Sequence, residues 1–186
     1  CYTDDTFIIR DNGNATDHLI LDSNSRISLS NNDGNTSNTV FGKNAFEATS
    51  EGDVGADYNV AIGEDAMGTG NLAAAVNNVA VGYKALEDIT SGDYNIAIGK
   101  DAGSSITDAV SNIFIGQAAG NTTTSADKTI GIGHGAMQAN VTSAAVGSIA
   151  IGYQSLNALT SGIGNVAIGS GSMAANVTSD YNTAVG

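Results

Sequence analysis

Proline and tryptophan are absent from this chain, and aromatic residues are scarce. Of the 186 residues, 41% are hydrophobic but only 5% are aromatic, whereas glycine occurs 24 times. Because large side chains are so few, any core must consist mainly of valine, isoleucine and alanine in thin layers. The lack of proline argues against a proline-rich linker, and it suits long β-ladders in which nearly every backbone N–H donates a hydrogen bond.

Basic residues and cysteines are also few. Six lysines and arginines stand against 19 acids, which gives a net charge of −13. So few cations cannot follow a phosphate backbone, so we expect no nucleic-acid partner, and an acidic surface repels anionic membranes. Cys1 alone supplies neither a disulfide framework nor a metal cluster. The chain has no apolar run long enough for membrane insertion, and its two ends, Cys1 and Gly186, look like cuts within something longer.

The most regular feature is a glycine that closes a five-residue motif, such as NIAIG at 95–99. These glycines follow one another at intervals of 21, 19, 17, 17, 17, 19, 17 and 17 residues. All the intervals are odd, so they differ by even numbers, and even insertions preserve the alternating faces of a β-strand. Such short units cannot bury a face alone and must stack on one another. The closing glycines are Gly42, Gly63, Gly82, Gly99, Gly116, Gly133, Gly152, Gly169 and Gly186.

The motif itself predicts a strand with two different faces. It usually starts with asparagine, and its Val or Ile positions flank a small residue, as Ile96 and Ile98 flank Ala97. The β-branched residues favour a strand, but the motif does not decide which face points into the coil and which meets another chain. If the alanine face met another chain, its small side chains would let the two backbones approach closely. The predicted structural repeat residues are Asn59, Gly63, Asn78, Gly82, Asn95, Gly99, Asn112, Gly116, Gly133, Gly152, Asn165 and Gly169.

The residues after each glycine complete one coil. A small residue such as Ala85 lies three positions on, a larger apolar residue such as Leu86 often follows, and a polar turn such as 90–93 ends the unit. Turn-forming residues separate the apolar segments throughout. The sequence therefore predicts an all-β parallel β-solenoid or β-roll over 38–186, rising about 40 Å in eight steps of roughly 4.8 Å. Helix is expected to be minor, although the segment 71–76 is rich in alanine.

Residues 1–37 contain no copy of the motif. The segments 7–10, 18–22 and 26–30 read as strands, with turn-forming residues at 11–13 and 31–34. An open solenoid end exposes the edge of a strand, which natural proteins usually cover. We therefore predict that residues 1–37 form an N-terminal β cap or connector and that residues 38–186 form the repeat array.

Motifs that would carry chemistry are weak. The pattern G-x-G-x-x-G/A begins at Gly68, Gly131 and Gly162, but a dinucleotide site also needs a preceding strand and a following helix. His18 and His134 have no cysteine or carboxylate at ligand spacing, and acid pairs do not recur in register. We therefore expect no enzyme activity, no cofactor and no metal. A solenoid-type glycan hydrolase or lyase would need clustered acids in a groove between coils.

Three rows of side chains leave alternatives open. Stacked asparagines can form ladders between coils or cap turns, or they can bind a glycan. The tyrosines beside the motif, Tyr58, Tyr94, Tyr181, Tyr83 and Tyr153, either pack against neighbouring coils or chains or form sugar-stacking platforms. Threonines recur in the loops, as in ice-binding solenoids, but without a flat TxT ladder they are expected to cap turns.

The repeat resembles that of two groups of fibrous proteins. The pattern NVAIG-x-x-A with TSG loops, and the lead-in LDSNSRISLSNND at 21–33 before NTVFG, resemble the repeat shaft of phage tail fibres, particularly of marine cyanophages. The pattern is also similar to the head of trimeric autotransporter adhesins, a left-handed parallel β-roll whose units are usually shorter. The resemblance covers residues 21–186, and it implies a homotrimeric fibre without catalysis and with a role in host attachment.

These implications define the expected function and partners. The first expectation is a structural shaft or receptor-binding part of a phage tail fibre, located in the virion as an extracellular fibre. The alternative is a bacterial trimeric autotransporter-type adhesin on the cell surface. The partners would be two further copies of the chain and a host cell-surface receptor, for which a glycan is one candidate. Three chains together would carry a charge of −39, which salt water screens.

Overall fold

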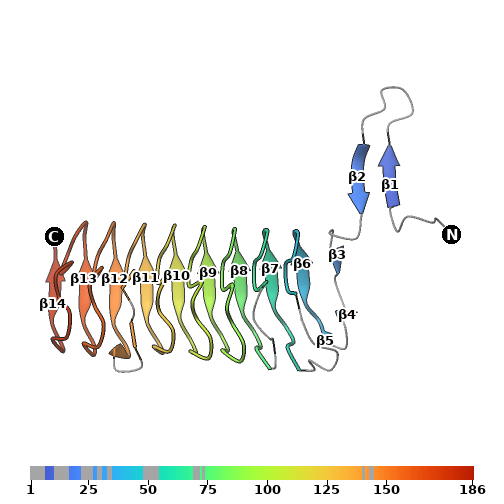
Figure 1. Cartoon of the computed structure of the whole chain (residues 1–186). Helices are drawn as coiled ribbons and strands as arrows, with labels where there is room; N and C mark the ends of the chain where they lie inside the picture. Colours follow the sequence, from blue (N-terminus) through green and yellow to red (C-terminus); the bar gives the residue numbers. More distant parts are fainter. Residues whose placement is uncertain are drawn as a thin grey trace.

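The array folds as a row of stacked coils, each of which presents one short strand to the same side (Figure 1). The structure, a computed structural model, describes residues 7–10, 17–21, 27–28, 31–32, 35–47, 55–68, 72, 74–139, 141–142 and 145–186. Within these ranges the chain contains strands, turns and bends but no α-helix. The predicted all-β parallel β-solenoid is therefore confirmed, and the described part of the alanine-rich segment 71–76 is not helical.

Nine parallel strands of three residues each form one long sheet with a tenth, antiparallel strand at its N-terminal edge. Each of the nine coincides with one copy of the repeated motif. They are Thr39–Phe41 (β6), Val60–Ile62 (β7), Val79–Val81 (β8), Ile96–Ile98 (β9), Ile113–Ile115 (β10), Ile130–Ile132 (β11), Ile149–Ile151 (β12), Val166–Ile168 (β13) and Thr183–Val185 (β14).

The strands stack in an unbroken parallel register. Val60 pairs with Val79 and Ile96 pairs with Ile113, and the offsets between paired residues reproduce every glycine interval of the sequence. The longer units therefore place their extra residues outside the strands. Because no strand slips by a residue, equivalent side chains form continuous columns along the array.

The segment before the array also contains strands. Phe7–Arg10 (β1) pairs antiparallel with Asp17–Leu21 (β2), and Asn31–Asn32 (β4) pairs with Asn35–Thr36 (β5). Ile27–Ser28 (β3) pairs antiparallel with β6 and covers the edge of the first repeat strand. The predicted strands at 7–10, 18–22 and 26–30 overlap β1, β2 and β3, whereas the short pair β4 and β5 was not predicted, because 31–34 was expected to be a turn. The expected turn at 11–13 lies outside the described residues. The division at residue 37 stays a prediction.

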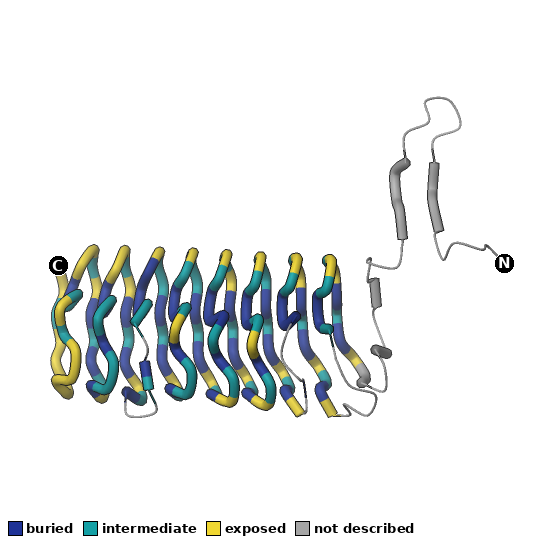
Figure 2. The backbone as a smooth tube through the Cα atoms, viewed as in Figure 1, coloured by how far each residue is buried: buried dark blue, intermediate teal, exposed yellow. Residues whose placement is uncertain are grey.

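The two faces of the sheet have opposite surroundings (Figure 2). The middle residue of the strands β6 to β13 is buried, and the alanines there, such as Ala80 and Ala97, are fully inaccessible to solvent. The flanking Val and Ile residues point outward and are half-buried or exposed. The alternative in which the alanine face meets another chain is therefore wrong. A small residue suits this position in most coils because larger side chains from the rest of the coil, such as Leu86, are buried in the same interior.

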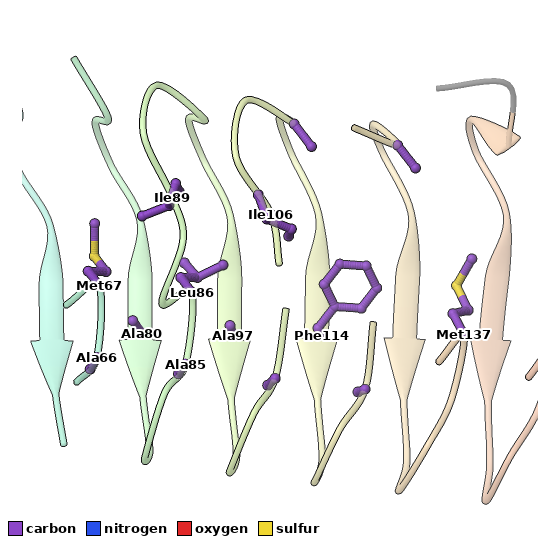
Figure 3. Close-up of a cluster of buried hydrophobic side chains, with 14 of the residues drawn as sticks. Ala66, Met67, Ala80, Ala85, Leu86, Ile89, Ala97, Ile106, Phe114 and Met137 are labelled. Carbon is purple, nitrogen blue, oxygen red and sulfur yellow. The ribbon is translucent and has the colours of Figure 1, made fainter. Parts of the chain in front are cut away.

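Two further columns complete the interior of the coils (Figure 3). The larger apolar residue four positions after the glycine is buried in most coils, as in Met67, Leu86 and Met137, and a second column includes Leu72, Ile89 and Ile106. Side chains of one coil thus pack on those of the next, which produces one continuous core of one side-chain thickness.

Phe114 is the one large aromatic residue at the middle strand positions, where Val40 and Gly131 also replace alanine. Its ring fills space left empty by the column of larger residues, because the coils of β9 and β10 carry Gly103 and Gly120 where the neighbouring coils carry Leu or Met. A Cβ placed on Gly120 would meet Cδ1 of Phe114 at 2.5 Å, and one placed on Gly131 would meet it at 2.9 Å. Three glycines therefore surround one large ring, and the local core volume is conserved.

Candidate functional site

The asparagines of the motif join each coil to the next one. Asn59 Oδ1 accepts the backbone N–H of Asn78 at 2.9 Å, and Asn59 Nδ2 donates to the carbonyl of Ala75 at 2.8 Å. Asn78 and Asn95 repeat this pattern, and Asn112 Oδ1 accepts from both the backbone N–H and the hydroxyl of Thr129. These side chains are fully buried from Asn38 through Asn165. The row is therefore an internal ladder, and it is not available to a glycan.

The glycines of the motif form the corner where the chain leaves the sheet. From Gly42 to Gly186 they have φ between 125° and 140°, a conformation that L side chains rarely adopt. The coils also stack too closely there for a side chain, since a Cβ on Gly99 would lie 2.7 Å from the carbonyl carbon of Gly116. The predicted repeat glycines thus set the coil spacing, and none contributes a functional group.

The outward face of the sheet is the largest candidate interaction surface, and we call it the aliphatic face. It carries two side chains from each repeat strand, and no charged residue lies among them. Its members are Thr39, Phe41, Val60, Ile62, Val79, Val81, Ile96, Ile98, Ile113, Ile115, Ile130, Ile132, Ile149, Ile151, Val166, Ile168, Thr183 and Val185. A contiguous apolar surface of this length usually marks a contact with another molecule.

Sequence reasoning left the direction of this face open. A signal within the sequence could have resolved it, because the alanine column changes to Phe114 where Gly103 and Gly120 replace larger residues. Such compensation is expected only between positions that share one interior. The alanine side was therefore recognisable as the inside of the coil.

Exposed tyrosines lie on both borders of the aliphatic face. Tyr58, Tyr94 and Tyr181 are exposed at the turn before each strand, and Tyr83 and Tyr153 are exposed just after the glycine corner. Some of these rings contact an adjacent coil, since Tyr153 meets His134 and the Tyr181 ring lies close to Gly164, yet all five keep much of their surface exposed. Packing against another chain and stacking on sugars both stay predictions.

Lysines in the described part of the array form ion pairs near the glycine corner. Lys43 Nζ lies 3.1 Å from Glu64 Oε1, Lys84 Nζ lies 2.6 Å from Glu87 Oε1, and Lys100 Nζ lies 2.9 Å from Asp101 Oδ2. Hydrogen bonds to Glu64 and Glu87 raise the pKa of Lys43 and of Lys84 above the ordinary lysine value. A raised lysine pKa means that these pairs stabilise the fold at neutral pH and lose that effect only as the pH rises through the lysine range. Exposed pairs of this kind contribute little.

The residues considered for catalysis or ligand binding do not come together as a reactive site. His134 is exposed and contacts the ring of Tyr153 edge-on, with centroids 5.5 Å apart. The G-x-G-x-x-A pattern at 131–136 consists of the glycine beneath Phe114, a corner glycine and a turn. In the described ranges, no three His, Cys, Asp or Glu side chains are grouped so that they could hold a metal. Side chains of His18 and Cys1 lie outside those ranges.

The loop threonines also act within the fold. The hydroxyls of Thr90, Thr142 and Thr160 each donate to a backbone carbonyl of the following coil, at 2.9–3.1 Å. These hydroxyls therefore link successive coils at their loops, whereas a cap within a single turn was expected. Because these hydroxyls already donate within the protein, they do not form a free flat row of the kind that an ice-binding surface requires.

Comparisons with protein-family models, with curated proteins and with solved structures give no match to this chain. Among the residues that the structure describes, no helix is long and apolar enough to span a membrane.

Proposed function

We propose that this protein is the structural shaft and receptor-binding part of a phage tail fibre, and that it mediates host-cell attachment as a homotrimer. One observation carries the proposal: the aliphatic face extends over all nine repeat strands without a charged residue. A face of this kind, if it were exposed to water, would favour aggregation. Covering it with identical faces of other copies removes apolar side chains from water along the whole array.

The shape of the face supports a side-by-side arrangement. It is a strip two side chains wide and about 38 Å long, given eight steps of roughly 4.8 Å. A strip parallel to the solenoid axis is best buried when the axes of the copies run nearly parallel. Three copies related by a three-fold axis would each present the same strip to that axis and form a closed, symmetric assembly. The result is a stiff rod, which suits a shaft.

Charge placement supports the same arrangement. The described lysines and their carboxylate partners lie in the turns beyond the glycine corner or in loops, and none lies in a repeat strand. Interfaces typically have an apolar centre depleted of charge and a polar rim. With the aliphatic faces at the centre of a trimer, the charge of −13 per chain would remain on the outside, in contact with solvent.

Native mass measured by light scattering tests the assembly. We expect three times the chain mass of 18.6 kDa and dissociation in the variant Ile98→Lys, which places a charge within the aliphatic face. Ile163→Lys is the matched control, because Ile163 is 38% exposed against 39% for Ile98 but lies outside the repeat strands. A wild-type monomer, or equal effects of the two variants, would contradict the proposed trimer.

Adsorption to cells tests the attachment role. Fluorescently labelled protein is expected to bind some strains in a panel of bacteria, and Ile98→Lys should bind far more weakly because a monomer loses avidity. Absence of binding to every bacterial strain, with binding to animal cells instead, would favour the adhesin alternative over the tail fibre.

A further inference from the structure

Charge is distributed very unevenly along this chain. Eighteen of its 19 acidic residues lie within residues 1–127, and residues 129–179 contain no Asp, Glu, Lys or Arg. This stretch contains the strands β11, β12 and β13, and its single ionisable side chain other than tyrosine belongs to His134. Burying the aliphatic face in a trimer does not require the rest of the surface to lose its charged residues. The uncharged surface beyond the glycine corner therefore needs a separate explanation.

That surface carries aromatic rings and amides. Tyr153 is 51% exposed and meets the edge of the His134 ring at an interplanar angle of 79°. Asn157 Nδ2 donates to the carbonyl of Gly135 at 3.1 Å and to Gln138 Oε1 at 3.3 Å, which holds two amides in a fixed orientation beside the rings. Gln154 is exposed next to Tyr153. We call these five residues, His134, Gln138, Tyr153, Gln154 and Asn157, the amide–aromatic patch.

Glycines keep the patch open. The position two residues after the corner is Asp65, Lys84 or Asp101 in three of the earlier coils, but it is Gly135 and Gly171 on the two sides of Gln154. A Cβ on Gly171 would meet nothing within 4 Å, and one on Gly135 would approach only side-chain atoms, at 3.3 Å or more. The two glycines therefore add no side chain of their own beside Gln154, and Gly171 borders open space.

Tyr83 occupies the equivalent position in an earlier coil and has different surroundings. Lys84 Nζ and Lys100 Nζ lie 5.6 Å and 5.9 Å from its ring centroid, so cations cover that ring. Tyr83 is 40% exposed, which makes it a close structural match to Tyr153 without open access to the ring.

We propose that the amide–aromatic patch binds an uncharged saccharide. An aromatic ring offers a flat apolar surface to the C–H groups of a sugar ring, and side-chain amides both donate to and accept from hydroxyl groups. A surface without charge has no ion pair to offer an anionic glycan, but it loses no charged hydration when a neutral sugar covers it. The inference rests on the proposed function, because it assigns the receptor class and the binding residues of that fibre.

An array of immobilised oligosaccharides, neutral ones beside sialylated and sulfated ones, tests this assignment with the full-length protein. We expect binding to a subset of neutral oligosaccharides only. For the strongest of these, Tyr153→Ala should weaken binding about tenfold or more, because the variant loses the flat apolar surface on which the sugar ring lies. Gln154→Glu should also weaken binding, and it preserves the size of an exposed side chain. Tyr83→Ala is the matched control and should bind like the wild type.

The inference is overturned if only anionic glycans bind, if no glycan binds, or if Tyr83→Ala weakens binding as much as Tyr153→Ala does. Adsorption to bacteria separates it from the proposed function. Unchanged adsorption of both Tyr153→Ala and Gln154→Glu would overturn the patch while leaving the attachment role intact. Binding to a neutral oligosaccharide that depends on Tyr153, without adsorption to any bacterium, would support the patch and contradict host attachment.

Discussion

At the scale of single residues, the coil geometry depends on the glycine corners, where a side chain would be strained or would clash with the next coil. Gly99 has φ of 132° and stacks directly on Gly116, whereas Gly147 has φ of 76° and open space around its Cβ position. Gly99 is therefore constrained both by its backbone conformation and by close stacking, whereas Gly147 is constrained by its conformation alone. The sequence does not distinguish these two cases.

Replacing each of these glycines with alanine tests the distinction. Gly99→Ala combines an unfavourable φ with a clash between backbones and should lower the free energy of unfolding by roughly 3–5 kcal/mol. Gly147→Ala is the control and should cost only about 1–2 kcal/mol, because the left-handed conformation alone is unfavourable. Urea unfolding followed by circular dichroism measures both. Equal losses would show that stacking at the corner is not the constraint.

Thr123 is a second informative residue, because its buried Oγ1 has no hydrogen-bond partner. It belongs to the column that carries Ile106 in the preceding coil. A buried hydroxyl without a partner is unfavourable by about 1–3 kcal/mol, so Thr123→Val should raise the midpoint of thermal unfolding. Thr90→Val serves as the comparison and should lower it, since Thr90 donates to the carbonyl of Thr107. A lower midpoint for Thr123→Val would mean that its hydroxyl is satisfied.

At the scale of the coil, side chains from different segments share one interior volume. Phe114 comes from the strand β10, whereas the glycines around it come from the turn segments of two coils and from β11. In other coils the position of Gly120 holds Leu86 or Met137, both with positive φ. Larger residues are therefore conformationally acceptable there once the ring of Phe114 is absent.

A double-mutant cycle tests this shared volume. Phe114→Ala should leave a cavity and lower the free energy of unfolding by about 3–5 kcal/mol. Gly120→Leu alone should also destabilise the protein, because its side chain would collide with the ring. The combined variant should be more stable than the sum of the two effects predicts, as the leucine fills the cavity. Additive losses would show that the two positions do not share a cavity.

At the scale of the whole molecule, charge and apolar surface are separated. The acidic residues are concentrated in the first two thirds of the chain, while the aliphatic face runs along the full length of the array. In the proposed trimer, like charges would repel one another across the outside while the apolar strips hold the chains together. The balance between these two effects depends on ionic strength.

Salt should therefore favour the proposed trimer. Screening weakens the repulsion between chains, since the Debye length falls from about 30 Å at 0.01 M to about 8 Å at physiological ionic strength, while apolar contacts are not weakened. Sedimentation of serial dilutions should show dissociation at a higher protein concentration in low salt than in high salt. Dissociation on addition of salt would instead indicate an interface held by ion pairs.

The sequence by itself determined the repeat, its strand positions, the parallel register and the all-β class. These follow from local properties, because alternating Val and Ile around an alanine specify a strand and glycine alone fits the corner conformation. Even the ladder of asparagines was foreseeable as one of two roles, and the structure shows that its members both link coils and satisfy the turns.

Only the tertiary structure decided which face of the strand is inside and what surrounds each exposed ring. The alanines face inward because the closed coil brings the strand close to the buried residues of its own turn segment, and this spacing is a property of the closed coil rather than of any strand. The open ring of Tyr153 and the covered ring of Tyr83 likewise depend on side chains of adjacent coils. Lys100 lies 17 residues from Tyr83 and His134 lies 19 residues from Tyr153, so a pattern within one repeat cannot encode these contacts.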